Sequence, residues 1–190
     1  MSKKKIILGV LAVGFLWWLF FGGSEKWKEE VQLSDGRIIV IHRETIREGG
    51  GDEISINSSG SKPKEHRIQF TNPDGSGKKI EWRSTKMTPS NRPEISLILD
   101  IENGHPVLYG SVFVRDGCEN YLKYVFKNDR WDEENLPEKF PERKTNLLIR
   151  DGTSMPRFVD LEDKKKMNSQ VGYAKSLRKV GPNREICGSD

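Results

Sequence analysis

The N-terminal segment constrains this chain more than any other part of it. Residues 6–23 form a run of 18 residues without a charged side chain. As a helix this run is about 27 Å long, close to the roughly 30 Å hydrocarbon layer of a bilayer. Trp17 and Trp18 lie near its far end, where aromatic side chains favour the membrane interface. The sequence therefore predicts a transmembrane anchor over residues 6–23.

The charges around this run predict its orientation. Lys3, Lys4 and Lys5 precede it and hold the N-terminus in the cytoplasm, because positively charged flanks stay on the inner side. We expect a cytoplasmic n-region (1–5), the anchor (6–23), a β-rich periplasmic domain (25–150) and a polar C-terminal extension tied back to it (151–190). The expected location is the bacterial inner membrane, in a single pass, with lipid as the partner of the helix.

A cleaved signal peptide is the alternative to an anchor. Gly22 and Ser24 would then occupy the small −3 and −1 positions, with cleavage before Glu25. The apolar run is longer than the usual h-region of about 7–15 residues, and it ends in two bulky tryptophans. We therefore favour the anchor and retain the cleaved form as the second interpretation.

The charge balance argues against nucleic acid as a partner. The chain has 32 basic and 28 acidic residues, and three of the basic ones are the lysines before the anchor. The remaining 29 basic residues are nearly balanced by the 28 acidic ones. No field of a single sign is left to attract a polyanion.

Composition and alternation predict the fold class. The mean hydropathy is −0.68 even with the anchor included, so the exported part is polar and its core must be small. Short alternating apolar segments separated by turn signals favour strands. We expect a mainly β (β-rich α+β) fold, with a single antiparallel-sheet domain after the N-terminal transmembrane helix.

Three hairpins carry this prediction. Asp35-Gly36 separates strands expected at 27–33 and 38–43, and a type I′ turn is expected there because such turns need two positive φ angles. Asn103-Gly104 separates strands expected at 95–102 and 105–115, and a third hairpin covers 67–71 and 78–83. The apolar 38–41 segment predicts a central strand covered on both faces, and the Gly- and Ser-rich residues 47–66 predict a mobile loop.

The two cysteines predict a disulfide. Cys118 and Cys187 both follow the anchor, and two thiols in an oxidising compartment pair more often than they stay free. The closed loop of about 70 residues is worth roughly 4 kcal/mol in the chain-entropy model. This bond would tie the C-terminal tail to the sheet.

No motif for catalysis, cofactor or metal binding stands out, so we assign no such residues. The glycine-rich stretch 74–79 lacks the Ser or Thr that follows the lysine of a phosphate-binding loop. The Ser-x-x-Lys pattern occurs five times, without its companion motifs. His42, His66 and His105 are scattered rather than at ligand spacing. Asp100 and Glu102 lie on the same face of one strand. Paired carboxylates catalyse glycoside hydrolysis, but a strand face exposed to solvent explains these two acidic residues better.

Aromatic residues are the remaining candidates for a binding surface. Trp82, Tyr109 and Trp131 are typical of a surface that stacks on glycans or anchors a peptide. Aromatic side chains on the strands of a small domain more often form its core. Both interpretations remain open at the level of the sequence.

Two stretches carry a family resemblance. The first is Trp27-x-Glu29-x-Val31-x-Leu33-Ser34-Asp35-Gly36-Arg37, and the second is Val180-Gly181-Pro182-Asn183-Arg184 followed by Cys187. Together they resemble a group of proteobacterial envelope proteins, membrane-anchored or secreted, to which no activity has been assigned. The resemblance covers the two ends of the exported region and implies a bacterial envelope location.

These observations predict a non-enzymatic binding module of the cell envelope. A polar, small-cored β domain on one anchor, without a coherent acid–base or nucleophile set, favours binding of an envelope protein or glycan. The alternative is a cell-wall-directed hydrolase whose catalytic residues the sequence does not identify. A deep pocket with convergent titratable groups would favour the enzyme.

Overall fold

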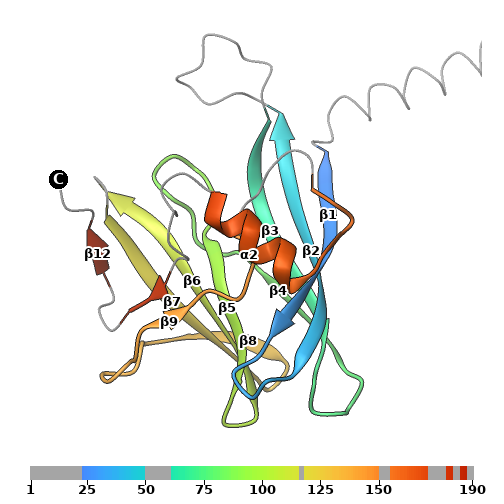
Figure 1. The fold of residues 1–190 in the computed structure, drawn as a ribbon. Coiled ribbons are helices and arrows are strands. Elements are labelled where there is room, and N and C mark those ends of the chain that lie inside the picture. Colours follow the sequence, from blue (N-terminus) through green and yellow to red (C-terminus); the bar gives the residue numbers. More distant parts are fainter. Residues whose placement is uncertain are drawn as a thin grey trace, which may run out of the picture.

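The computed structural model describes residues 23–49, 61–115, 118–149, 155–170, 179–181 and 185–187 (Figure 1). The predicted anchor lies outside these residues apart from Gly23. So do its interfacial side chains, Lys3, Lys4, Lys5, Trp17 and Trp18. Within the described ranges, no helical segment combines the length and the apolar character that a bilayer span requires.

Two antiparallel meanders of four strands form the fold, and each belongs to a different sheet. The first sheet includes one further strand, β10, which runs parallel to β1. In spatial order its strands are β10 (Phe158–Val159), β1 (Ser24–Gln32), β2 (Ile38–Gly49), β3 (Ser61–Thr71) and β4 (Lys79–Arg83).

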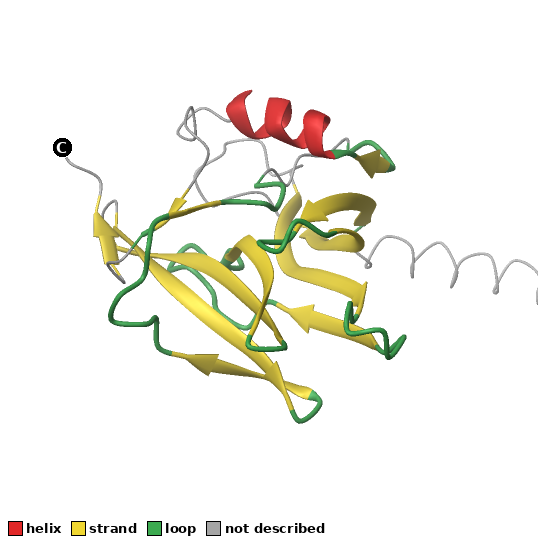
Figure 2. Cartoon of the chain, turned by 60° about the horizontal axis from the view of Figure 1, so that its bottom comes forward, coloured by secondary structure: helices red, strands yellow, loops and turns green. Residues whose placement is uncertain are grey.

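The second sheet begins at the edge strand β5. At the other edge, two short strands pair with different parts of β7. β12 pairs with residues 118–120, and β8 pairs with residues 123–127. Its strands are β5 (Ile95–Glu102), β6 (His105–Arg115), β7 (Cys118–Lys127), β8 (Arg130–Glu134) and β12 (Glu185–Cys187). The ribbon of β9 (Arg143–Lys144) and β11 (Lys179–Val180) and the helix α2 (Leu161–Gln170) lie outside both sheets (Figure 2).

Alternate side chains of both meanders meet in one core between the sheets. Its largest members are Ile41, Ile68, Phe70, Ile80 and Trp82 from the first sheet and Leu99, Leu108, Leu122 and Tyr124 from the second. This arrangement confirms the mainly β prediction, whereas the expected single sheet is wrong. Alternation identifies the buried face of each hairpin, but it does not say which hairpins share a sheet. Residues 84–94 carry the chain from one sheet to the other.

Side-chain hydrogen bonds close both seams between the sheets. At one seam Trp131 Nε1 donates to the carbonyl of Glu81, at 2.8 Å. At the other, the Asn146 amide donates to the carbonyls of Gln32 and Leu99, at 2.9 and 2.8 Å, and accepts the Leu99 N–H at 3.0 Å. Residues 145–149 thus lie between β1 and β5.

Further apolar clusters cover two more faces. Phe140, Ile149 and Val180 pack on the face of the second sheet that carries Tyr109 and Val125. Trp27, Leu148 and Val159 form a small cluster with Met155 and Met167. The last of these belongs to α2, which therefore covers the β1–β10 edge.

The hairpin turns lie together at one end of the sandwich. Arg37 Nη1 donates to the carbonyl of Pro73 at 2.7 Å, and Lys78 forms an ion pair with Asp129. These contacts join the turns at 33–37, 72–78 and 128–129. Gly23 lies at the opposite end of β1, where its carbonyl accepts the Arg47 N–H at 3.1 Å.

Two turn predictions have different outcomes. Asn103 and Gly104 have φ of 51° and 78°, as a type I′ turn requires, and β5 and β6 have the predicted bounds. In the first hairpin Gly36 has φ of 88°, whereas Asp35 has no positive φ. The Gly36 N–H bonds to the Leu33 carbonyl at 3.0 Å, so a type I turn followed by a left-handed glycine replaces the expected type I′ turn.

The environment of β2 corrects two further expectations. This strand is central in its sheet, as predicted, but Ile38 and Val40 on its outer face are 53% and 47% exposed. The sheet is therefore covered on one face only at this point. β2 and β3 also extend into the expected loop, because residues 47–49 and 61–66 are strand. Residues 50–60 lie outside the described range.

The predicted disulfide is confirmed. Cys118 and Cys187 are bonded, with an S–S distance of 2.14 Å, and they lie opposite each other in the β7–β12 pairing. Cys118 is buried and Cys187 is exposed. The bond fixes β12 at the edge of the second sheet, as the sequence predicted for the tail.

Candidate functional site

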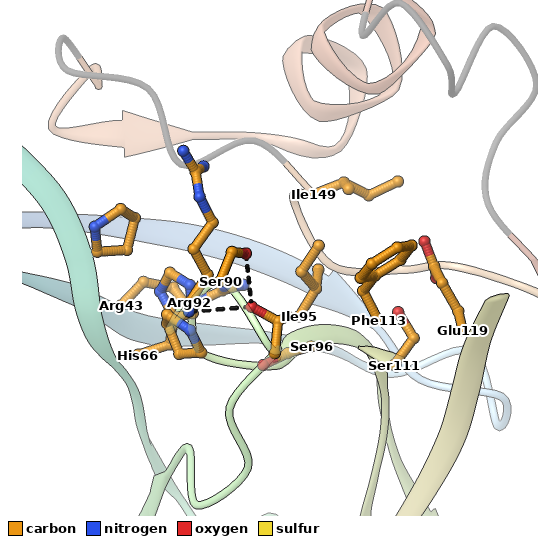
Figure 3. A pocket seen from close by; sticks show the side chains of 13 residues that line it. Arg43, His66, Ser90, Arg92, Ile95, Ser96, Ser111, Phe113, Glu119 and Ile149 are labelled. Atoms are coloured by element: carbon orange, nitrogen blue, oxygen red, sulfur yellow. Dashed lines mark hydrogen bonds between the residues drawn. The ribbon is translucent and has the colours of Figure 1, made fainter. Parts of the chain in front are cut away.

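A cavity of about 380 Å³ lies between the ends of the two sheets (Figure 3). β2 and β3 of the first sheet supply one wall, and β5, β6 and the start of β7 supply the other. Thr88, Ser90 and Arg92 of the 84–94 crossing segment lie at its mouth. Its volume is within the range of small-molecule sites, about 300–1,000 Å³.

Arg43 gives the first wall a buried positive charge. It follows Ile41 on the inward face of β2, and its Nη1 donates to Glu29 Oε1 at 3.1 Å. The guanidinium carbon lies 5.2 Å from the ring centre of Trp27. Among the described residues, neither Nε nor Nη2 has a hydrogen-bond partner. Within the described part of the chain, the guanidinium is thus hydrogen-bonded through Nη1 only.

Glu29 is the fully buried counter-charge of Arg43, with 0% exposure. It lies on the inward face of β1, between Trp27 and Val31. The Leu148 N–H is 3.4 and 3.3 Å from its two carboxylate oxygens. Because a buried carboxylate is costly without partners, this pair explains why Glu29 and Arg43 interrupt an otherwise apolar face.

His66 lies beside Arg43 on the next strand. Its Nδ1 is 3.1 Å from the hydroxyl of Thr45, the residue opposite it in the β2–β3 register. Burial, together with the smaller effect of the nearby charges of Arg43 and Arg47, lowers the pKa of His66 from 6.5 to about 3. The imidazole is therefore neutral at physiological pH, in a positive local potential.

The opposite wall carries hydroxyl groups at an irregularity in the sheet. The β5–β6 register shifts between Ser96 and Ile98. The backbones of β5 and β6 come close together there because Gly110 has no side chain. A Cβ on Gly110 would lie 2.9 Å from the Ile95 carbonyl oxygen. Ser96 lines the cavity, and its buried Oγ has no hydrogen-bond partner among the residues that the structure describes. A buried hydroxyl without a partner is uncommon in proteins, and it is often a sign of a ligand or water site.

The rest of the lining is mostly apolar and includes two polar residues, Ser111 and Glu119. Figure 3 shows Arg43 and His66 on one side of the cavity and Phe113 and Ile149 on the other, with Ile95 between them. Phe113 is 39% exposed, which is unusual for a phenylalanine of a small domain. The cavity therefore has a cationic, hydrogen-bonding side and an apolar side.

Glu94 holds the crossing segment that forms the mouth. Its carboxylate accepts the N–H groups of Thr85 and Lys86 at 2.7 and 3.1 Å, and the hydroxyl of Tyr124 at 2.5 Å. Burial raises the pKa of Glu94, and these hydrogen bonds counteract the rise. The Thr88 hydroxyl further accepts the Arg92 N–H at 3.0 Å.

The predicted aromatic surface is not a single surface. Trp82 and Trp131 line one shallow hollow of about 370 Å³ beside β4 and β8, although Trp82 is only 2% exposed. Tyr109 is fully buried on the other face of the second sheet and donates its hydroxyl to Glu102 at 2.8 Å. The structure thus brings two of the three residues together, mainly as core, and separates the third.

The expectation of a solvated face for Asp100 is wrong. Asp100 is buried and accepts the N–H and hydroxyl of Ser34, each at 3.0 Å. Arg143 donates to Asp100 and also to Glu102, the latter at 2.8 Å. The two carboxylates therefore share Arg143, and Lys123 lies 3.5 Å from Glu102 as a second cation. These contacts hold the first hairpin and β9 against β5, which is a structural role.

A second hollow, of about 490 Å³, lies on the outer face of the first sheet and is lined by basic residues. Two of its cations share one carboxylate, since Lys26 and Arg67 lie 3.1 and 3.6 Å from Glu44. Near the disulfide, Glu185 lies close to both sulfur atoms. Because the sulfurs are bonded to each other, this group lacks the thiolates that a metal would need. The cavity at Arg43 is the stronger candidate.

Sequence reasoning missed the residues of this cavity. His66 is part of the loop expected at 47–66, and Arg43 is the last residue of the strand expected at 38–43. A signal was present, because Glu29 lies between the inward Trp27 and Val31 on β1, and Arg43 follows the inward Ile41 on β2. Comparisons of the chain with protein families, with curated proteins and with solved structures find no match. The functional argument therefore depends on the geometry of the cavity.

Proposed function

We propose that this chain is a non-catalytic binding domain of the bacterial cell envelope that takes a small anionic ligand in the cavity at Arg43. In this proposal residues 6–23 hold the domain on the periplasmic face of the inner membrane. The observation that carries the proposal is the Arg43 guanidinium, which lines the cavity with donors that are unpartnered among the described residues.

The chemistry of the wall favours an anion. A guanidinium presents its N–H groups in a fixed fork that matches a carboxylate or phosphate. Glu29 and Trp27 hold this fork in place before any ligand arrives, which lowers the entropic cost of binding. Burial is the main cause of the lowered pKa of His66, and the positive charges of Arg43 and Arg47 contribute to it.

The disulfide supports an envelope location. Structural disulfides persist in oxidising compartments such as the bacterial periplasm, and Cys118 and Cys187 are bonded in this structure. The resemblance of both ends of the chain to proteobacterial envelope proteins agrees with that compartment.

A binding measurement on the full chain in phosphatidylcholine nanodiscs tests the anion site. Hexanoate is the probe, and its affinity is followed by calorimetry. We expect the double variant Glu29→Gln/Arg43→Met to weaken binding by about 10- to 100-fold, the worth of one or two charge-assisted hydrogen bonds. Removing both charges together avoids leaving one of them buried without a partner.

Two exposed arginines provide a matched comparison. Arg92→Ala at the mouth of the cavity weakens hexanoate binding, whereas Arg83→Ala on β4, outside the cavity, leaves it unchanged. If hexanoate binds the double variant as tightly as the native chain, the proposed site is wrong.

The hydrolase alternative has one observation in its favour, because Ser96 and His66 line the same cavity. A serine nucleophile needs a base within hydrogen-bond distance, yet Ser96 Oγ has no hydrogen-bond partner within the described ranges. We expect a fluorophosphonate probe to leave Ser96 unlabelled in the full chain, as judged by peptide mass spectrometry. Labelling that the Ser96→Ala variant abolishes would favour the enzyme instead.

A further inference from the structure

We infer that the ligand is a single-chain anionic amphiphile from the membrane, such as a fatty acid or a lysophospholipid, with its charged head at Arg43 and its chain along Phe113. This inference rests on the proposed function and names the ligand class of the same cavity. Two independent features carry it: where the cavity lies in the fold, and how its two sides differ.

The cavity lies near the point where the chain leaves the predicted anchor. The Gly23 carbonyl accepts the Arg47 N–H at 3.1 Å, and Arg47 is opposite Pro63 in the β2–β3 register. Pro63 lines the cavity. Because neighbouring strands are about 4.8 Å apart, two strand spacings place this wall roughly 10 Å from the backbone at Gly23. A domain tethered at Gly23 thus holds the cavity close to the bilayer surface.

The two sides of the cavity match the two parts of an amphiphile. Arg43 and His66 lie on one side, and a neutral imidazole beside a guanidinium can bond a carboxylate or phosphate oxygen without a second desolvated charge. Ile95, Phe113 and Ile149 lie on the other side and offer an apolar track. Phe113, exposed where the track reaches the surface, is positioned to cover a chain that extends out of the cavity.

The size of the cavity favours one chain over two. Its volume of about 380 Å³ lies near the lower end of the range for small-molecule sites. A diacyl phospholipid has two chains that diverge from one head, whereas the structure has a single apolar side beside the cation. Arg92 at the mouth adds a second positive charge for a phosphate-bearing head.

The inference is tested with three probes on the full chain in phosphatidylcholine nanodiscs, with binding measured by native mass spectrometry and calorimetry. Dodecanoate carries both an anion and a chain, acetate carries the anion alone, and dodecyl maltoside carries the chain alone. We expect dodecanoate to bind at least ten-fold more tightly than either of the other two.

Paired phenylalanine variants locate the chain. Phe113→Ser weakens dodecanoate binding five-fold or more and leaves acetate binding unchanged. Phe158→Ser, which removes an equally exposed phenylalanine outside the cavity, changes neither. Lysophosphatidylglycerol in place of dodecanoate distinguishes a phosphate head from a carboxylate head, and tight binding of either supports the inference.

The outcomes separate this inference from the proposed function. One outcome is that dodecanoate and acetate bind with equal affinity and that both lose binding in Glu29→Gln/Arg43→Met. This result would support the anion site and overturn the inference that the ligand is an amphiphile. Equal affinity for dodecanoate and dodecyl maltoside would overturn both, because the head would then contribute nothing. Binding of none of the probes would likewise overturn both.

Discussion

At the scale of single residues, the candidate site depends on charges buried where a small domain would normally place apolar side chains. Glu29 and Arg43 lie on inward faces and are bonded to each other at 3.1 Å. A buried ion pair contributes little net stability compared with apolar residues of the same size, since both groups lose their hydration. A pair that adds little stability but includes a guanidinium lining a cavity is what the proposed binding role requires.

The buried His66 predicts a pH dependence of stability. Its pKa is lowered from 6.5 to about 3 in the folded state, so the unfolded chain binds more protons between these values and stability falls as the pH falls through this window. For this histidine alone, the free energy of unfolding decreases by about 2 kcal/mol between pH 7 and pH 5. Urea denaturation of the native chain and of His66→Gln at both pH values measures the difference.

The carboxylates titrate alike in both proteins, so the comparison isolates His66. We expect the variant to lose less stability than the native chain over this interval. Equal losses in the two proteins would mean that the imidazole is not buried as described.

At the scale of elements, the crossing segment 84–94 connects the fold to the candidate site. It carries the chain from β4 to β5, and its residues 88, 90 and 92 form the mouth of the cavity. Few of its own side chains are buried, so its conformation depends on Glu94. That carboxylate ties two backbone N–H groups of the segment to the second sheet through Tyr124.

Removing this carboxylate tests its role. Glu94→Ala leaves three buried donors without an acceptor and lowers the free energy of unfolding by roughly 2–4 kcal/mol. Glu94→Gln keeps the shape and most of the hydrogen bonds, and it costs about 1 kcal/mol. Chemical denaturation measures the loss in free energy of unfolding for each variant. Similar losses in Glu94→Ala and Glu94→Gln would mean that the hydrogen bonds are not the cause.

At the scale of the whole molecule, two meanders, two seams and one disulfide define the domain. The core between the sheets is continuous, but β12 is held at the edge of β7 by three residue pairs and the Cys118–Cys187 bond. The disulfide thus stabilises the C-terminal strand more than the core.

The disulfide predicts a measurable loss on its removal. The cysteines are separated by 69 residues, and the chain-entropy model gives about 4 kcal/mol for a loop of that length. Cys118→Ser/Cys187→Ser therefore lowers the free energy of unfolding by about this amount. Urea denaturation checks it, with the native chain under a reducing agent as the comparison. A loss below about 1 kcal/mol would mean that the bond has no stabilising role.

The anchor is also tested on the whole molecule. Alkaline phosphatase fused after Asp190 is expected to be active and β-galactosidase inactive, because only the first folds in the periplasm. Carbonate extraction leaves the chain in the membrane fraction. A soluble mature protein that begins at Glu25 would instead establish the cleaved signal.

Local structure followed from the sequence, and long-range structure did not. The bounds of β5 and β6 were predictable because Asn103-Gly104 fixes the turn and alternation fixes the faces. The disulfide was predictable because only two cysteines exist. The division into two sheets was not predictable, because the contacts that join the sheets connect residues far apart in the sequence. Asn146, for example, bonds to Gln32, which is 114 residues away. The cavity was missed for the same reason, because Arg43, His66 and Ser96 converge from three separate strands.

The grouping of the hairpin turns has a practical consequence. Gly23 and the turns lie at opposite ends of β1, so an anchored domain presents the 33–37, 72–78 and 128–129 turns to the periplasm, farthest from the lipid. An epitope inserted at Gly75, a left-handed position with open space around it, should be reachable by antibody in permeabilised cells without disturbing the cavity. That turn would allow the intact protein to be detected without altering the proposed site.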